Sequence, residues 1–317
     1  MDESLKSLGI DDLRSECKRG CRYYYMTVID SLDRHALFNK LIIERLKRKN
    51  DDIKEIYDQT CGNWPQTLHI LLFRMMGGST NKWSFDHLAR LATYNIIARE
   101  GSSLIAIEAL LLGASGLLDL CPTDNYGLRL REEYKHLCAK YNIHGMSVQD
   151  WQLVKLYPNN HPILRLMQLA SCYYYNTLSM HNVAKCTRRN DVLRLFEPQT
   201  SEYWTSVVMP KAGTSHVTRR IGRMKSDIIG INVVAQINHA FGHYIRSEAT
   251  MERAFNLLKD IPAEQNIYIN AWNSHATTAT SALDSQALLQ LSKEYCDKER
   301  CADCPFIPHL FNSIHRK

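Results

Sequence analysis

The apolar residues of this 317-residue sequence recur three and four positions apart along most of its length. That spacing lines side chains along one face of an α-helix, whereas a half-buried strand alternates apolar and polar residues. The pattern is clearest in Leu68–Met76, Leu130–Tyr141, Ile163–Tyr174, Ile231–Ile245 and Leu283–Tyr295. No segment shows clean alternation flanked by the Asn-Gly or Asp-Gly turns of a strand ladder. We therefore predict an all-α fold, an irregular multi-helix array with a C-terminal cysteine-rich loop.

The composition agrees with a helical globular protein. Hydrophobic residues make up 45% and charged residues 23%, which excludes a disordered or fibrous chain. The 14 glycines and 9 prolines are few for a turn-rich β architecture, and only Tyr203–Met209 has a short β-prone composition. We predict a single helical domain over residues 1–317. The alternative is two subdomains, 1–121 and 128–317, because residues 122–127 read as a turn.

Neither end of the chain nor its apolar runs predict export or membrane insertion. The N-terminus lacks a basic start followed by an apolar run, so it does not read as a signal peptide. The longest apolar run, Leu104–Leu120, contains Glu108 and Asp119 and is shorter than the roughly 20 apolar residues of a membrane helix. Ten cysteines are too sparse and irregular for a secreted disulfide scaffold. We expect a cytoplasmic protein with no membrane partner and a core helix in the apolar run.

Three cysteines lie close together near the C-terminus, as Cys296-x4-Cys301-x2-Cys304. Thiolates are soft ligands that suit zinc or an iron–sulfur cluster, and two cysteines three positions apart can bind one ion. A closed structural site needs a fourth ligand, for which we predict His309. The alternatives for that ligand are His315 or a distant cysteine. The other interpretation is that three thiols merely lie near one chain end.

The cysteine spacing is similar to the iron–sulfur loop of some helical DNA glycosylases, although those loops use four cysteines and a different first gap. Such enzymes also need a glycine-rich hairpin that binds phosphate through backbone N–H groups. The corresponding stretch here, Leu258–Glu264, has no glycine, and its terminal carboxylate would repel phosphate. The hairpin hypothesis therefore fails.

Positive charge is concentrated in one segment of the chain. The formal net charge is only +6, but no acidic residue occurs between Glu202 and Asp227. The basic residues that we predict to contact nucleic acid there are Lys211, Arg219, Arg220, Arg223 and Lys225. Contacts of this kind with phosphates give salt-dependent, sequence-independent affinity. The alternative is a plain solvated loop. A second basic run, Arg45–Lys49, is expected to end a helix, where cations favour the helix dipole.

A catalytic centre is not evident from motifs. There is no glycine-rich phosphate loop, no Gly-x-Ser-x-Gly elbow and no dinucleotide fingerprint. His239 and His243 are spaced to share a helix face, but the glutamate of a hydrolytic motif is absent, so a solvated face is the simpler interpretation. An enzyme would instead require Glu108 and both histidines to converge in one pocket.

Several short segments resemble an uncharacterised bacterial family that consists of a domain of unknown function. They are Ser31–Asp33, Leu41–Lys49, Gly62–Trp64, Ile107–Gly113, Gly116–Leu118, Ser201–Trp204, and Asp284–Leu291 with Glu294–Cys296 and the two later cysteines. The resemblance implies that longer relatives carry an N-terminal nuclease-like segment with Gly-Pro-Asp and Glu-x-His signatures. This chain has neither signature, so the resemblance implies a match to the helical C-terminal part alone and transfers no activity.

These observations predict a non-catalytic helical scaffold or binding protein, associated with nucleic acid through its basic loop and holding a structural zinc or iron–sulfur site. The alternative is a nucleic-acid-processing metalloenzyme remotely similar to the helical iron–sulfur DNA glycosylases. A third interpretation is a structural subunit without a ligand.

Overall fold

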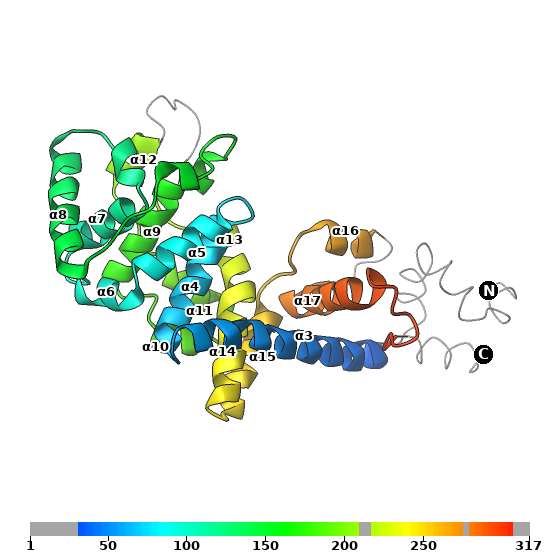
Figure 1. Cartoon of the computed structure of the whole chain (residues 1–317). Coiled ribbons are helices and arrows are strands. Elements are labelled where there is room, and N and C mark those ends of the chain that lie inside the picture. Colours follow the sequence, from blue (N-terminus) through cyan, green and yellow to red (C-terminus); the bar gives the residue numbers. More distant parts are fainter. Residues whose placement is uncertain (1–30, 209–216, 275–278, 307–317) are drawn as a thin grey trace, which may run out of the picture. The chain divides into compact units, whose positions relative to one another are not determined.

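The computed structural model describes residues 31–208, 217–274 and 279–306, and this part of the chain is helical (Figure 1). Its first half contains α3 (Ser31–Gln59), α4 (Trp64–Gly77), α5 (Lys82–Leu91), α6 (Tyr94–Arg99), α7 (Leu104–Ala114), η2 (Leu117–Leu120), α8 (Asn125–Tyr141), η3 (Val148–Asp150), η4 (Pro158–Asn160) and α9 (Pro162–Tyr174). Its second half contains α10 (Met180–Ala184), α11 (Arg189–Leu195), α12 (Glu202–Val208), α13 (Arg223–Ile229), η5 (Gly230–Val234), α14 (Ala235–Tyr244), α15 (Glu248–Asp260), α16 (Ile267–Asn273), α17 (Ala282–Leu291) and η6 (Ser292–Cys296).

The prediction of an all-α fold is confirmed. Within the described residues the sole β feature is an isolated bridge between Pro262 and Ser281, and there is no strand. The β-prone stretch after Tyr203 forms helix α12 instead, because Trp204 is fully buried there and its indole Nε1 donates a hydrogen bond to Glu108 at 2.9 Å. Tertiary burial outweighs local β propensity at this position.

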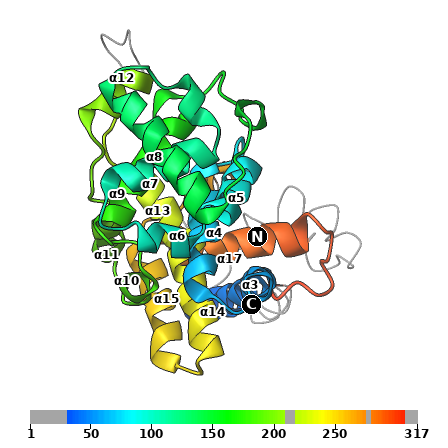
Figure 2. The same cartoon turned by 60° about the vertical axis from the view of Figure 1, so that its left-hand side comes forward.

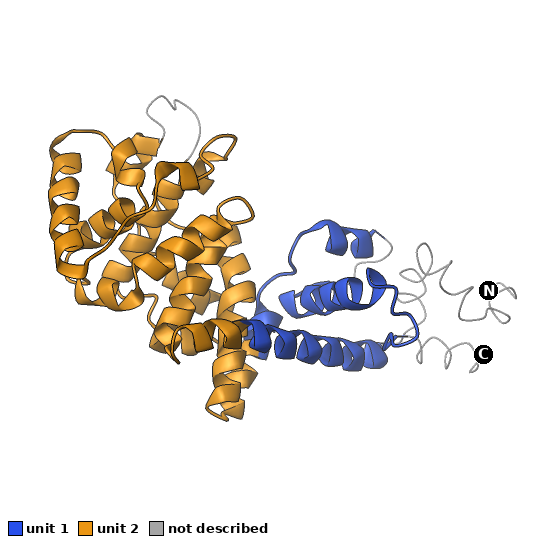
Figure 3. Cartoon of the chain, viewed as in Figure 1, with its two compact units in different colours: residues 1–52, 255–317 blue, residues 53–254 orange. Residues whose placement is uncertain are grey.

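Contacts divide the chain into two compact units (Figure 3). Unit 1 consists of residues 1–52 and 255–317, so it joins the two ends of the sequence, and unit 2 consists of residues 53–254. The turn at residues 122–127 lies inside unit 2, and a subdivision of the chain at that turn stays a prediction.

Unit 2 is built around the apolar helix α7, which packs against α8 and α9 (Figures 1 and 2). Every residue from Ala106 to Ala114 is buried, as expected for a core helix. Gly113 is needed for this packing, since a Cβ atom built there would lie 2.1 Å from the ring of Tyr134 on α8. Within the described residues, no helix is long and apolar enough to cross a membrane.

A buried hydrogen-bonded histidine joins α4 to α9 within unit 2. The ring of His69 is fully buried, with Nε2 3.0 Å from the carbonyl oxygen of Ala92 and Nδ1 2.7 Å from the hydroxyl of Tyr173. A carbonyl can only accept, so Nε2 carries the proton and Nδ1 accepts from the tyrosine. Burial lowers the pKa of His69 from 6.5 to about 3, so the ring is neutral.

Unit 1 contains a buried polar network between α3 and α17. Nε of Arg45 donates to Oε1 of Gln286 at 2.6 Å, and Nε2 of Gln286 donates to Glu264 at 2.7 Å. Burial lowers the pKa of Arg45 to about 10 and raises that of Glu264. The prediction that a helix ends at Arg45–Lys49 is wrong, because α3 continues to Gln59. Arg45 is buried and bonded to Gln286.

We predict that Gly113→Ala destabilises the protein by about 1–3 kcal/mol, because the added methyl group overlaps the ring of Tyr134. An ordinary exposed glycine-to-alanine change in a helix has the opposite sign. Urea unfolding measures the difference. Gly222→Ala is the control, since nothing lies within 4 Å of its added Cβ. Equal stability of Gly113→Ala and the native chain would contradict this packing.

The lowered pKa of His69 predicts acid-sensitive stability. The unfolded chain takes up a proton near pH 6.5 while the folded ring stays neutral to about pH 3, so folding free energy is lost as the pH falls between these values. The slope from this group is about 1.4 kcal/mol per pH unit. Urea unfolding at pH 4, 5 and 6 measures how the free energy of unfolding depends on pH. The His69→Gln variant should lose this slope. The control His243→Gln, which changes an exposed histidine, should keep it.

Candidate anion-binding pocket

The five basic residues predicted to contact nucleic acid do not share one environment. Lys211 lies outside the described residues. Arg219 is bound within the protein, with Nε 2.8 Å from the carbonyl oxygen of Thr200 and Nη1 3.2 Å from Glu202. Lys225 is half-buried, and its ammonium donates to the carbonyl oxygen of Met75. Arg220 and Arg223 are exposed.

The loop before α13 is held in place by α9 and by the segment before it. Nε2 of Gln168 donates to the carbonyl oxygens of Thr218 and Arg220, at 2.8 and 3.2 Å. Asn159 accepts from the backbone N–H of Thr218 at 2.8 Å. The main chain of Arg220 is thereby fixed while its side chain remains exposed, so the guanidinium is presented by a stable backbone.

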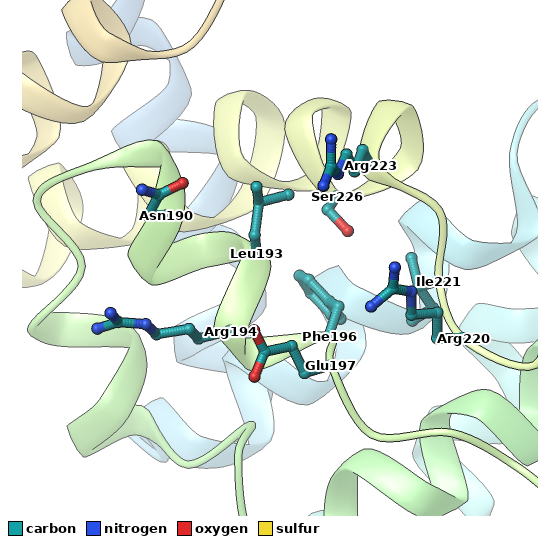
Figure 4. Close-up of a pocket in the computed structure, with 9 residues that line it drawn as sticks. All are labelled: Asn190, Leu193, Arg194, Phe196, Glu197, Arg220, Ile221, Arg223 and Ser226. Atoms are coloured by element: carbon teal, nitrogen blue, oxygen red, sulfur yellow. The ribbon is translucent and has the colours of Figure 1, made fainter.

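Arg220 and Arg223 line a pocket of about 300 Å³ in unit 2 (Figure 4). The residues around it are Asn190, Leu193, Arg194, Phe196, Glu197, Arg220, Ile221, Arg223 and Ser226. Figure 4 shows Arg220 and Arg223 on the side of α13, and Arg194 and Glu197 on the side of α11, with Phe196 between them. Three arginines and one glutamate therefore line the pocket together with apolar residues, and in Figure 4 the side chain of Arg194 extends away from Arg220 and Arg223.

The side chains of the pocket arginines have no partner among the residues that the structure describes. Across residues 31–208, 217–274 and 279–306, the side chains of Arg194, Arg220 and Arg223 form neither a hydrogen bond nor an ion pair. By contrast, the neighbouring Arg189 forms a two-pronged bond to Asp227, with both N–O distances at 2.8 Å. Three unpaired guanidinium groups against one carboxylate leave a net positive pocket, which favours an anion with several oxygen atoms.

Arg194 is the pocket residue that the sequence pattern did not indicate. It lies in the run Arg188–Glu197, where two carboxylates, Asp191 and Glu197, hide any local excess of positive charge. In the structure Asp191 caps α11 by accepting from the backbone N–H groups of Thr187 and Arg188, so it does not neutralise Arg194. The positive charge of the pocket therefore depends on which carboxylates are already hydrogen-bonded elsewhere, and not on the number of charged residues in the segment.

The predicted cysteine ligands lie at the end of η6 and in the turn that follows it. The backbone N–H of Cys304 donates to the carbonyl oxygen of Cys301 at 3.1 Å, and all three thiols, including that of Cys296, are half-buried. His309 lies outside the described residues. In the described part of unit 1 and unit 2, no three His, Cys, Asp or Glu side chains are grouped as a metal site would require.

Glu108, His239 and His243, which an enzyme would bring together in one pocket, lie in different environments. Glu108 is fully buried and accepts hydrogen bonds from the hydroxyl of Tyr126 at 2.6 Å and the indole of Trp204 at 2.9 Å. Burial raises its pKa, and the two donors partly oppose this. His239 is buried on α14, whereas His243 is exposed. Glu108 thus acts as a buried acceptor that holds α12 on α7.

Comparison with known families matches residues 11–267 to a family described as "Protein of unknown function (DUF2851)". No curated protein and no solved structure shows a significant match. The match spans most of the chain and includes the whole of unit 2 with its basic pocket. It confirms the resemblance to an uncharacterised domain family, and the chain belongs to the DUF2851 family.

Proposed function

We propose that this protein is a non-catalytic helical binding protein that associates with nucleic acid through the arginine pocket. The observation that carries the proposal is a pocket lined by three arginines whose side chains have no partner in the described part of the chain. Nucleic acid is the partner that matches this charge, because each nucleotide supplies a phosphate oxyanion that an arginine can bind in a bidentate manner.

The charge of the pocket supports the phosphate backbone of a nucleotide chain as its occupant. Phe196 and Ile221 line the pocket but are only 1% and 3% exposed, so the contacts open to a ligand are chiefly those of the arginines. Sequence-tolerant binding rests on such contacts with the phosphate backbone. The pocket therefore suits backbone binding without base readout. This mode of binding agrees with the predicted scaffold role.

The double variant Arg220→Ala/Arg223→Ala should weaken binding and flatten its salt dependence. Removing two phosphate contacts lowers the slope of log K against log salt by about 1.8 for a duplex and about 1.4 for a single strand. Fluorescence anisotropy with a labelled oligonucleotide across a salt series measures both the affinity and the slope.

The matched control is Arg129→Ala/Lys135→Ala, which removes two exposed cations from α8, outside the pocket. This control should leave the affinity and its salt slope close to the native values.

Glu197→Ala should tighten binding, since it removes the one carboxylate that lines the pocket. Equal losses in both double variants would show that net charge, and not the pocket, governs binding.

We further propose that Cys296, Cys301, Cys304 and His309 hold a structural zinc ion or iron–sulfur cluster. Supporting this, the turn from Cys301 to Cys304 keeps two thiols on one short loop. Cys304 also lies near Tyr295, whose hydroxyl donates to Glu44 on α3 at 2.8 Å. Closing the loop on a metal would therefore fasten the C-terminal segment to the helices of unit 1.

Anaerobically purified protein should contain either about one zinc ion per chain or iron together with sulfide. Elemental analysis measures the metal content, and an absorption spectrum detects an iron–sulfur cluster. Cys301→Ser/Cys304→Ser should lose the metal and lower the melting temperature, because metal binding contributes to folding. Cys61→Ser changes an exposed thiol of unit 2 and should retain it. Native protein without metal, or metal retained by the double variant, would refute the site.

A further inference from the structure

A second cationic cluster lies beside the loop of the pocket, and its arginine is buried. Arg165 is only 5% exposed on α9, and its Nη atoms donate to Gln168 at 3.1 Å and Asn160 at 2.9 Å. Its Nε is also buried and has no hydrogen-bond partner among the described residues. A buried guanidinium thus has two neutral acceptors and one unsatisfied donor.

Lys225 adds a second positive charge to the same place. Its ammonium donates one hydrogen bond, to the carbonyl oxygen of Met75, which is again a neutral group. Burial, together with the charge of Arg165, lowers the pKa of Lys225 to about 8. Gln168, which accepts from Arg165, also donates to the carbonyl oxygens of Thr218 and Arg220, so the loop that leads into α13 and Lys225 lies beside the arginine. Within the described residues neither cation is hydrogen-bonded or ion-paired to a carboxylate.

His161 brings a further buried polar atom close to Arg165 in the chain. It occupies the N-cap position of α9, four residues before Arg165, so both lie at the first turn of one helix. Within the part of the chain that the structure describes, its Nδ1 is buried without a hydrogen-bond partner and no side chain caps the N-terminus of this 13-residue helix. The helix dipole adds partial positive charge at that end.

This arrangement is incomplete without an anion. Two like charges out of water lose hydration and repel each other, and breaking the neutrality of a buried site is strongly unfavourable. Every acceptor that residues 31–208, 217–274 and 279–306 supply to Arg165 and Lys225 is a neutral amide or carbonyl oxygen. The Nε–H group of Arg165, with Nδ1 of His161 as a second buried polar atom, indicates where the missing acceptor belongs.

We infer that Arg165, Lys225 and His161 form a second anion site, which takes a phosphate group. A phosphate offers several oxygens and up to two negative charges, so it can accept from all three side chains and neutralise both cations. A chloride ion lacks the oxygens for that many directed bonds. None of these three residues lines the arginine pocket, so the site does not rest on the proposed nucleic-acid function.

The test is thermal unfolding of the full chain, dialysed free of phosphate and sulfate and then titrated with sodium phosphate. Sodium chloride at the same ionic strength is the reference. The melting temperature should rise by about 3 °C or more when phosphate reaches about ten times its dissociation constant. Isothermal calorimetry with inorganic phosphate should show one site per chain. Equal shifts in phosphate and chloride would overturn the inference.

Lys225→Met distinguishes an anion site from a merely structural lysine. It removes the repulsion with Arg165 while keeping the aliphatic stem, so its melting temperature in phosphate-free buffer should equal or exceed the native value. Its phosphate-dependent shift should disappear. A lower melting temperature combined with an undiminished shift would overturn the inference. Lys185→Met, which alters an exposed lysine of unit 2, should behave as native.

His161→Ala provides a second, independent variant if Lys225→Met does not fold. It should reduce the phosphate shift to less than half, and a native shift in this variant would count against the site. Arg220→Ala/Arg223→Ala should keep the full shift. An oligonucleotide with a 5′-phosphate, compared with its 5′-hydroxyl form, will show whether the site takes a free phosphate or a strand end. Either result leaves the test of the arginine pocket unchanged.

Discussion

Burial of helix α7 is the constraint on which unit 2 depends. Nine consecutive residues, Ala106 to Ala114, are removed from water, so α7 must be surrounded on all sides. Removing that much apolar surface from water is the main favourable term in folding. It also makes Glu108 a buried carboxylate, and the donors that satisfy it, Tyr126 and Trp204, join α8 and α12 to this helix. Helix α7 thus fixes the positions of α8 and α12 through its apolar surface and the buried carboxylate of Glu108.

Hydrogen bonding also distinguishes the buried polar groups that stabilise the fold from those that are candidates for binding a ligand. His69, Glu108 and the Arg45–Gln286–Glu264 network are buried, and each is hydrogen-bonded within the protein. Their perturbed pKa values reflect packing rather than chemistry. Around the loop before α13 the situation differs, because the guanidinium groups of the pocket have no partner in the described chain and Arg165 retains a buried donor without one.

Much of the fold could be predicted from residue order because helical periodicity is a local property. The apolar run from Leu104, the stripe after Ile163 and the stripe from Leu283 are all helices of the structure. Periodicity failed where tertiary contacts dominate. The β-prone residues around Trp204 are helical, and the indole is buried against Glu108. Helix α3 continues past the basic run to Gln59, and Arg45 is buried against Gln286, 241 residues away in the chain.

The candidate site shows the same division. The absence of acidic residues between Glu202 and Asp227 identified the basic loop, since net charge along a segment can be read directly from residue order. Which cations face solvent depends on hydrogen bonds across the fold. Arg220 lines the pocket, whereas Lys225, five residues later, is turned inward to the carbonyl of Met75 and the charge of Arg165. No local pattern encodes that difference, because it arises from the packing of α13 against helices far away in the chain.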